Sequence, residues 1–105
     1  QGHVDGTGTV RGITPEGDGV LMSIACPDKV LRYVVEKGSV TVDGVSLTVA
    51  SREADGFTIA LIPHTMASTT LGRDAVGRSV NLEADVVAKY VEALVRPHIP
   101  GGETS

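Results

Sequence analysis

Hydrophobic and polar residues alternate along most of the chain, and glycine or proline interrupts the alternation at short intervals. A period of two residues is typical of β-strands that bury one face. The pattern predicts five or six short strands, in the segments 4–13, 20–25, 40–42, 45–49, 57–62 and 79–84. Residues 14–19 (TPEGDG) have the composition of a turn.

The segment 40–49 alternates most regularly and has Asp43-Gly44 at its centre. This dipeptide favours a two-residue hairpin turn, because both residues readily adopt a positive φ. The predicted pairs are Val42–Val45, Thr41–Ser46, Val40–Leu47 and Ser39–Thr48. One face is then apolar, while the other, which we call the hydroxyl face, carries Ser39, Thr41, Ser46 and Thr48. Lys37 joins the hydroxyl face if the strand begins early enough.

Two segments depart from the β pattern. Pro27 and Asp28 are typical entry residues of a helix, and Asp28 is expected to cap a short helix that runs through Tyr33. Apolar residues recur at helical spacing over 86–95, directly after Asp85, which can cap the first turn. Together with the strands, whose core residues include Phe57, Ile59 and Leu61, these elements predict an antiparallel barrel or sandwich around one core.

Composition limits the class of protein. A chain of 105 residues with 41% hydrophobic content can close one core, here assigned to 1–96, with 97–105 as a flexible tail. The net charge of −4 and the three aromatic residues argue against nucleic-acid binding, and no apolar run approaches the ~20 residues of a membrane span. A single cysteine, Cys26, fits a reducing compartment, so we expect a cytoplasmic protein. Because the sequence opens with Gln1 and not Met, we expect a piece of a longer chain.

Common catalytic motifs are not found. Gly6-x-Gly8 lacks the third glycine of a dinucleotide fingerprint, and Ser46 lies in a strand and not in a hydrolase elbow. The three histidines have no ligand-like spacing, so no metal site is predicted.

The hydroxyl face has two interpretations. Its serines and threonines can be solvated strand formers, or they can bind an uncharged polyhydroxy ligand, because the interior of a small barrel is filled by its own side chains. Asp85 can likewise be a helix cap or a functional carboxylate, and Lys37 can be a solvated charge. His64 is interpreted as a loop residue.

Several blocks resemble riboflavin synthase of the alpha-chain type. The strongest is KGSVTVDGVSLTV at 37–49, and the others are GHVDG at 2–6, LIPHT at 61–65, TTLG at 69–72, VNLE at 80–83, and Asp85 with AKYVE at 88–92. The blocks keep the order of the family over residues 1–92. The resemblance implies a six-stranded antiparallel Greek-key barrel with a short connecting helix and a C-terminal helix.

In that family two such barrels lie in tandem, so the chain resembles the C-terminal half. The resemblance implies an N-terminal barrel as partner, from the same or a neighbouring subunit, and a homotrimer assembled through the helix at 86–95. It also implies a reaction without a cofactor, in which two molecules of 6,7-dimethyl-8-ribityllumazine exchange a four-carbon unit and give riboflavin and 5-amino-6-ribitylaminouracil.

Matched residue by residue, the resemblance assigns ligand contacts to Lys37, Ser46, Thr48, Ile62, Thr65 and Asp85. It assigns catalytic roles to Ser46, Asp85, Lys37 and His3, with His3 at the barrel entrance. Two alternatives stay open: a lumazine- or flavin-binding protein without catalysis, like the antenna proteins of luminous bacteria, and a structural barrel without a ligand. Retention of Ser46, Lys37 and Asp85 together favours the enzyme.

Overall fold

The computed structural model describes residues 4–63 and 76–95. The elements in this part of the chain are β1 (Gly6–Glu16), β2 (Gly19–Ala25), α1 (Asp28–Leu31), β3 (Ser39–Val42), β4 (Val45–Glu53), β5 (Gly56–Leu61), β6 (Ser79–Ala84) and α3 (Val86–Val95). The predicted tail at 97–105 lies outside the described residues.

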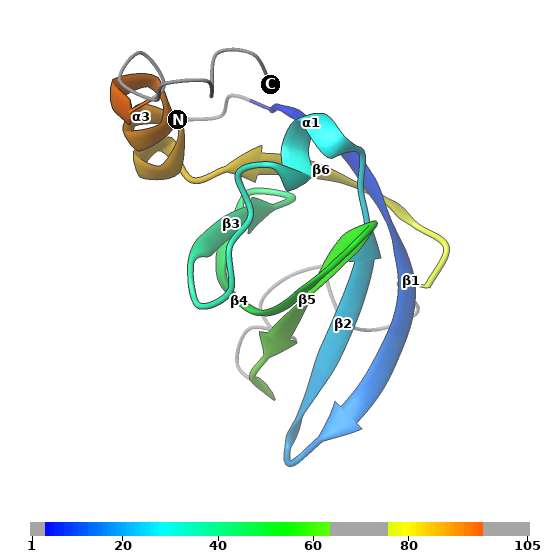
Figure 1. Cartoon of the computed structure of the whole chain (residues 1–105). Helices are drawn as coiled ribbons and strands as arrows, with labels where there is room; N and C mark the ends of the chain where they lie inside the picture. The colour runs from blue at the N-terminus through cyan, green and yellow to red at the C-terminus, as the bar shows by residue number, and fades with distance from the viewer. Residues whose placement is uncertain (1–3, 64–75, 96–105) are drawn as a thin grey trace.

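The six strands form a closed antiparallel barrel in the order β1-β2-β5-β4-β3-β6 (Figure 1). Strands β3, β4 and β5 follow one another as hairpins, and β6 returns to lie beside β3. Three successive hairpin strands with a fourth beside the first define a Greek key. The predicted six-stranded Greek-key barrel with a connecting helix and a C-terminal helix is therefore confirmed.

The β3–β4 hairpin has the predicted geometry. Its four residue pairs are those expected, from Val42–Val45 at the turn to Ser39–Thr48. Asp43 and Gly44 adopt φ angles of 48° and 84°, as a turn with two left-handed residues requires. The Asp43 N–H donates to the Asn81 carbonyl at 2.8 Å, and the Asn81 N–H donates to Asp43 Oδ1 at 2.7 Å. Asp43 thus fastens the hairpin tip to β6.

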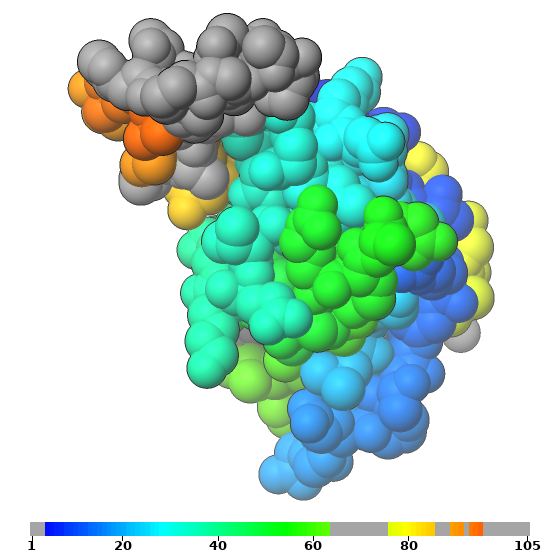
Figure 2. All heavy atoms as spheres, viewed as in Figure 1, coloured from blue at the N-terminus to red at the C-terminus, as the bar shows by residue number. Residues whose placement is uncertain are grey.

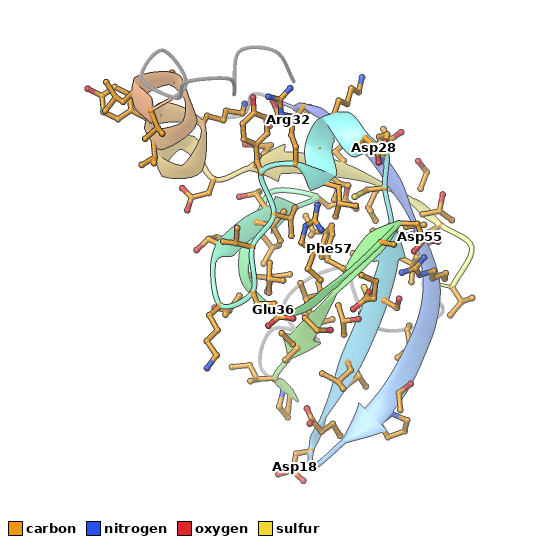
Figure 3. All side chains as sticks on the ribbon, in the orientation of Figure 1. Asp18, Asp28, Arg32, Glu36, Asp55 and Phe57 are labelled. Carbon is orange, nitrogen blue, oxygen red and sulfur yellow. The ribbon has the colours of Figure 1, made fainter. Side chains whose placement is uncertain are left out.

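Side chains from all six strands fill the barrel. Phe57 points into the interior and is fully buried (Figure 3), and Ile59 and Leu61 on the same strand are also buried. These three are the predicted core residues of β5. The other strands contribute Val10, Met22, Ile24, Val40, Val42, Val49, Val80 and Leu82. Because the interior is occupied, a ligand of this barrel has to bind on its outside.

The first hairpin and α1 differ from the prediction. Strand β1 continues to Glu16 and pairs with β2 as far as Gly19, so the turn is confined to residues 17–18. Pairing with β6 ends at Thr9, so Pro15 lies where β1 has one neighbour, a position that tolerates its missing N–H. Helix α1 ends at Leu31 and its cap position is Pro27 without a side-chain hydrogen bond, so the expectation that Asp28 caps it is wrong.

Helix α3 has the predicted bounds and protrudes from one end of the barrel (Figures 1 and 2). Its apolar residues Tyr90, Val91, Leu94 and Val95 are each between 46% and 64% exposed. The expectation that this helix shares the single core is therefore wrong for these four side chains, because the strands already fill the barrel. Within the part of the chain that the structure describes, neither α1 nor α3 is long and apolar enough to cross a membrane.

Candidate functional site

The hydroxyl face lies on the outside of the barrel, as predicted. Val40, Val42 and Val49 point inward and are buried, whereas Ser39, Ser46 and Thr48 are exposed and Thr41 is half-buried. Residues paired across antiparallel strands have side chains close enough to contact one ligand together. The hairpin therefore presents two neighbouring pairs of hydroxyls to solvent.

Strand β6 extends one of these pairs into a row that crosses three strands, and the residue directly after β6 follows in line with the other pair. Thr41 pairs with Ser46 on β4 and with Glu83 on β6, so these three residues form one row. The second row starts with Thr48 and Ser39, and the β3–β6 register, counted one residue past Val40–Ala84, puts Asp85 next to Ser39. Hydroxyls thus lie beside carboxylates at both levels of the face.

Asp85 is the single residue between β6 and α3. Its side chain is half-buried, and its carbonyl accepts a hydrogen bond from the Lys89 N–H at 3.2 Å. The residue directly precedes the helix, where a cap would stand, and also continues the second polar row. Both interpretations of Asp85 are compatible with this position.

Lys37 is placed differently from the strand extension that the sequence suggested. Strand β3 begins at Ser39, and Lys37 lies before it in a turn with a φ of 68°. Its N–H donates to the Val49 carbonyl at 2.8 Å, and the Val49 N–H donates to the Gly38 carbonyl at 2.9 Å. The Lys37 backbone is therefore fixed beside β4, one residue from Thr48, while its side chain is exposed.

Ile62 follows β5 directly and is 60% exposed, on the opposite side from the buried Ile59 and Leu61. The paired register of β4 and β5 ends at Val49 and Ile59. Ile62 lies beyond the end of this pairing, with its apolar side chain exposed to solvent. The other two predicted site residues, His3 and Thr65, lie outside the described residues.

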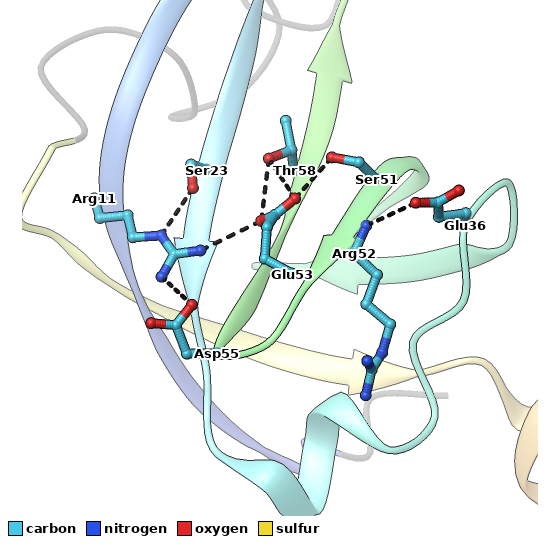
Figure 4. A network of polar contacts seen from close by, with 8 residues as sticks. All are labelled: Arg11, Ser23, Glu36, Ser51, Arg52, Glu53, Asp55 and Thr58. Carbon is cyan, nitrogen blue, oxygen red and sulfur yellow. Dashed lines mark hydrogen bonds and ion pairs between the residues drawn. The ribbon is translucent and has the colours of Figure 1, made fainter.

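A second polar cluster, which we call the Arg11 cluster, lies on another part of the outer surface (Figure 4), and the sequence did not reveal it. Arg11 donates to Ser23 Oγ at 2.8 Å, to Asp55 Oδ1 at 2.7 Å and to Glu53 Oε1 at 3.3 Å. Glu53 also accepts hydrogen bonds from Ser51 and Thr58. The register shifts make Arg11 the extra residue of a bulge in β1, which no local signal in the sequence indicates.

The positive charge of Arg11 is fully engaged by carboxylates within this cluster. The hydrogen bond and the charge of Arg11 lower the pKa of Asp55, and the same bond raises the pKa of Arg11. Since two carboxylates already bind the guanidinium, we interpret the cluster as a structural link between strands and not as an anion site.

Neither cysteine nor metal chemistry is indicated in the described residues. Burial raises the pKa of the Cys26 thiol, which therefore stays protonated at neutral pH. Among the described residues, no three His, Cys, Asp or Glu side chains gather as a metal site would require.

The structure is thus a filled six-stranded Greek-key barrel that carries hydroxyls and carboxylates on its outer face. The family model of the lumazine binding domain matches residues 1–85. The chain belongs to this family of lumazine-binding domains.

Curated relatives are about twice as long as the chain. It is 54% identical over 99 residues to a riboflavin synthase of Mycobacterium tuberculosis, which covers 91% of the chain and 49% of that relative. It is 40% identical over 90 residues to a riboflavin synthase of Bacillus subtilis, which covers 86% of the chain and 42% of that relative. The chain thus spans about half the length of the curated relatives that it matches.

Solved structures share the fold. LumP complexed with riboflavin superposes with a TM-score of 0.73 at 28% identity, over 80% of this chain and 45% of that one. LumP complexed with 6,7-dimethyl-8-(1'-D-ribityl) lumazine superposes with a TM-score of 0.70 at 30% identity, over 80% of this chain and 46% of that one.

Proposed function

We propose that this chain is the C-terminal half of a riboflavin synthase and binds 6,7-dimethyl-8-ribityllumazine on the hydroxyl face. The observation that carries the proposal is the outer row Ser46–Thr41–Glu83 beside the exposed Thr48–Ser39 pair, on a barrel whose interior is full; Asp85 follows one residue past the β3–β6 pairing. A ribityl chain carries several hydroxyls, which exchange hydrogen bonds with such a surface. Identity of 54% to a riboflavin synthase over nearly the whole chain supports the same function.

The proposed reaction is a dismutation without a cofactor. One lumazine loses a proton from its C7 methyl group and attacks the second, a four-carbon unit passes between them, and riboflavin and 5-amino-6-ribitylaminouracil leave. The protein contributes mainly by orienting two rings and by moving protons.

Each candidate residue has a proposed part in this scheme. Ser46, Thr48 and Thr65 hold the ribityl chain or the ring edge, and Ile62 packs against the heterocycle. Asp85 transfers a proton or holds a ring nitrogen. The Lys37 ammonium stabilises negative charge as the methyl proton leaves, and His3 contacts the second lumazine.

The second lumazine needs a second barrel. We propose that the N-terminal barrel of the same or a neighbouring subunit provides it, in keeping with relatives of twice this length. The exposed apolar residues of α3 support assembly of the full-length protein into a homotrimer. The proposed location is the cytoplasm, in keeping with a single free cysteine.

Fluorescence titration with the lumazine tests the binding part. Thr48→Val removes one hydroxyl from the ligand face without changing the side-chain shape, and it is expected to weaken binding about five- to tenfold. The matched control is Thr7→Val, which removes a hydroxyl that is also exposed, from β1. Equal affinities of the two variants would contradict the assignment of the face.

Catalysis is tested by mixing the chain with the separately produced N-terminal half of the Mycobacterium tuberculosis relative. Riboflavin should form in the mixture, and Asp85→Asn should reduce its rate. Tight binding of lumazine with no riboflavin from the mixture would instead favour a protein that binds without catalysis.

A further inference from the structure

The carboxylate of Asp5 holds both sides of the junction at Asp85. Asp5 lies just before β1, and its Oδ2 accepts a hydrogen bond from the Ala84 N–H at 2.7 Å. Its Oδ1 forms an ion pair with Lys89 Nζ at 2.5 Å, and its own N–H donates to the Leu82 carbonyl at 2.8 Å. One residue near the start of the chain thus contacts the end of β6 and the first turn of α3.

Asp85 is the residue that these contacts enclose. Ala84 ends β6, Val86 begins α3, and the Asp85 carbonyl accepts the Lys89 N–H. Asp5 therefore contacts two residues that are each bonded to Asp85: Ala84 through the peptide bond and Lys89 through a hydrogen bond. Without the Asp5 carboxylate, the backbone between the end of β6 and the start of α3 would lose these two contacts and be less restricted in its orientation.

The surroundings favour a strong interaction. The Asp5 side chain is 15% exposed and that of Lys89 is 31% exposed, so solvent screens the ion pair less than on an open surface. Lys89 Nζ also lies 5.9 Å from the ring centroid of Tyr33, and the Arg32 guanidinium lies 5.2 Å from the same centroid. Lys89 is thereby held between the carboxylate and an aromatic ring.

We propose that Asp5 is the positioning residue of the ligand face and acts through Asp85, an inference that rests on the proposed function. Asp5 does not touch the ligand. It fixes the backbone from which the Asp85 side chain reaches the row of Ser39 and Thr48.

Amide hydrogen exchange tests the structural step without any ligand. Asp5→Ala is expected to speed exchange of the Lys89 amide, which bonds to Asp85, while the Met22 amide at the barrel centre stays protected. Unchanged exchange at Lys89 would overturn the proposal. If Asp5→Ala unfolds the protein, Asp5→Asn is measured instead, since its amide oxygen can still accept the Ala84 N–H while the ion pair with Lys89 is lost.

Lumazine affinity tests the functional step. Asp5→Ala should weaken binding about fivefold, Asp5→Asn less, and the combination with Asp85→Asn no more than Asp85→Asn alone. Combination with Ser46→Ala should instead multiply the two losses. Full affinity in Asp5→Ala, or losses that multiply with Asp85→Asn, would refute a role through Asp85. Absence of lumazine binding by the unsubstituted chain would mean that the proposed function has failed, and the exchange at Lys89 would still decide whether Asp5 holds the junction.

Discussion

Substitutions of Asp43 separate two reasons why the β3–β4 hairpin, and with it the hydroxyl face, is held in place. Asp43 has a left-handed backbone with a φ of 48°, and its carboxylate accepts the Asn81 N–H at 2.7 Å. Asp43→Asn keeps both properties, because asparagine tolerates this conformation and its amide oxygen can accept the same hydrogen bond. Asp43→Gly keeps the backbone and loses the acceptor, and Asp43→Ala loses both.

The expected sizes follow from these contacts. Loss of the acceptor costs about 1 kcal/mol, since the bond is near the surface and the Asn81 N–H can turn to water. A left-handed alanine costs about 1 kcal/mol more. We therefore expect the free energy of unfolding to change by less than about 0.5 kcal/mol in Asp43→Asn, and to fall by about 1 kcal/mol in Asp43→Gly and about 2 kcal/mol in Asp43→Ala.

Urea unfolding measures these values from the midpoint, provided that the slope m is the same for all four proteins. Equal stability of the glycine and alanine variants would refute the contribution of the backbone. An asparagine variant as unstable as the alanine variant would refute the role of the hydrogen bond to β6.

Three further predictions concern the core, the surface charges and the turn before β3. Phe57→Ala should lower the free energy of unfolding by about 3–5 kcal/mol in a urea titration, because Phe57 is fully buried, and a loss below 1 kcal/mol would mean that the barrel can refill the space. The hydrogen bond and charge of Arg11 hold the pKa of Asp55 below its ordinary value of 3.8. The charged carboxylate therefore stabilises the fold above about pH 4, and this contribution is lost as the pH falls through the lower folded pKa. Asp55→Asn should flatten that part of the curve of stability against pH, and an unchanged curve would contradict the ion pair. Lys37→Gly should leave the melting temperature unchanged or raised, since a φ of 68° suits glycine, yet weaken lumazine binding, and unchanged affinity would remove Lys37 from the site.

The sequence predicts most accurately those elements whose signals are local. The β3–β4 hairpin follows from Asp43-Gly44 between alternating residues, and its register and faces come out as expected. Strand β6 and helix α3 also have their predicted bounds. The extent of β1 was not predictable in this way, because Pro15 is tolerated only where β6 no longer pairs with that strand.

Features that depend on distant pairing were missed. Glu83 joins the hydroxyl face only because β6 returns to pair with β3, and no local pattern shows which strand lies there. The contacts of Arg11 with Glu53 and Asp55 likewise need a bulge and strands far apart in the sequence. Lys37 has a left-handed backbone, and its N–H donates a hydrogen bond to the Val49 carbonyl on β4. A lysine in the sequence gives no sign of this conformation.

Mapping the lumazine on the protein tests the central claim most directly. In a series of two-dimensional amide NMR spectra with increasing 6,7-dimethyl-8-ribityllumazine, we expect the largest shifts at Ser39, Thr41, Ser46 and Thr48. The amides of Ser23 and Thr58 serve as internal controls, because the side-chain hydroxyls of these residues belong to the Arg11 cluster, and their chemical shifts should not change. Shifts centred on the Arg11 cluster, or no shifts at saturating lumazine, would contradict the assignment of the hydroxyl face as the ligand site.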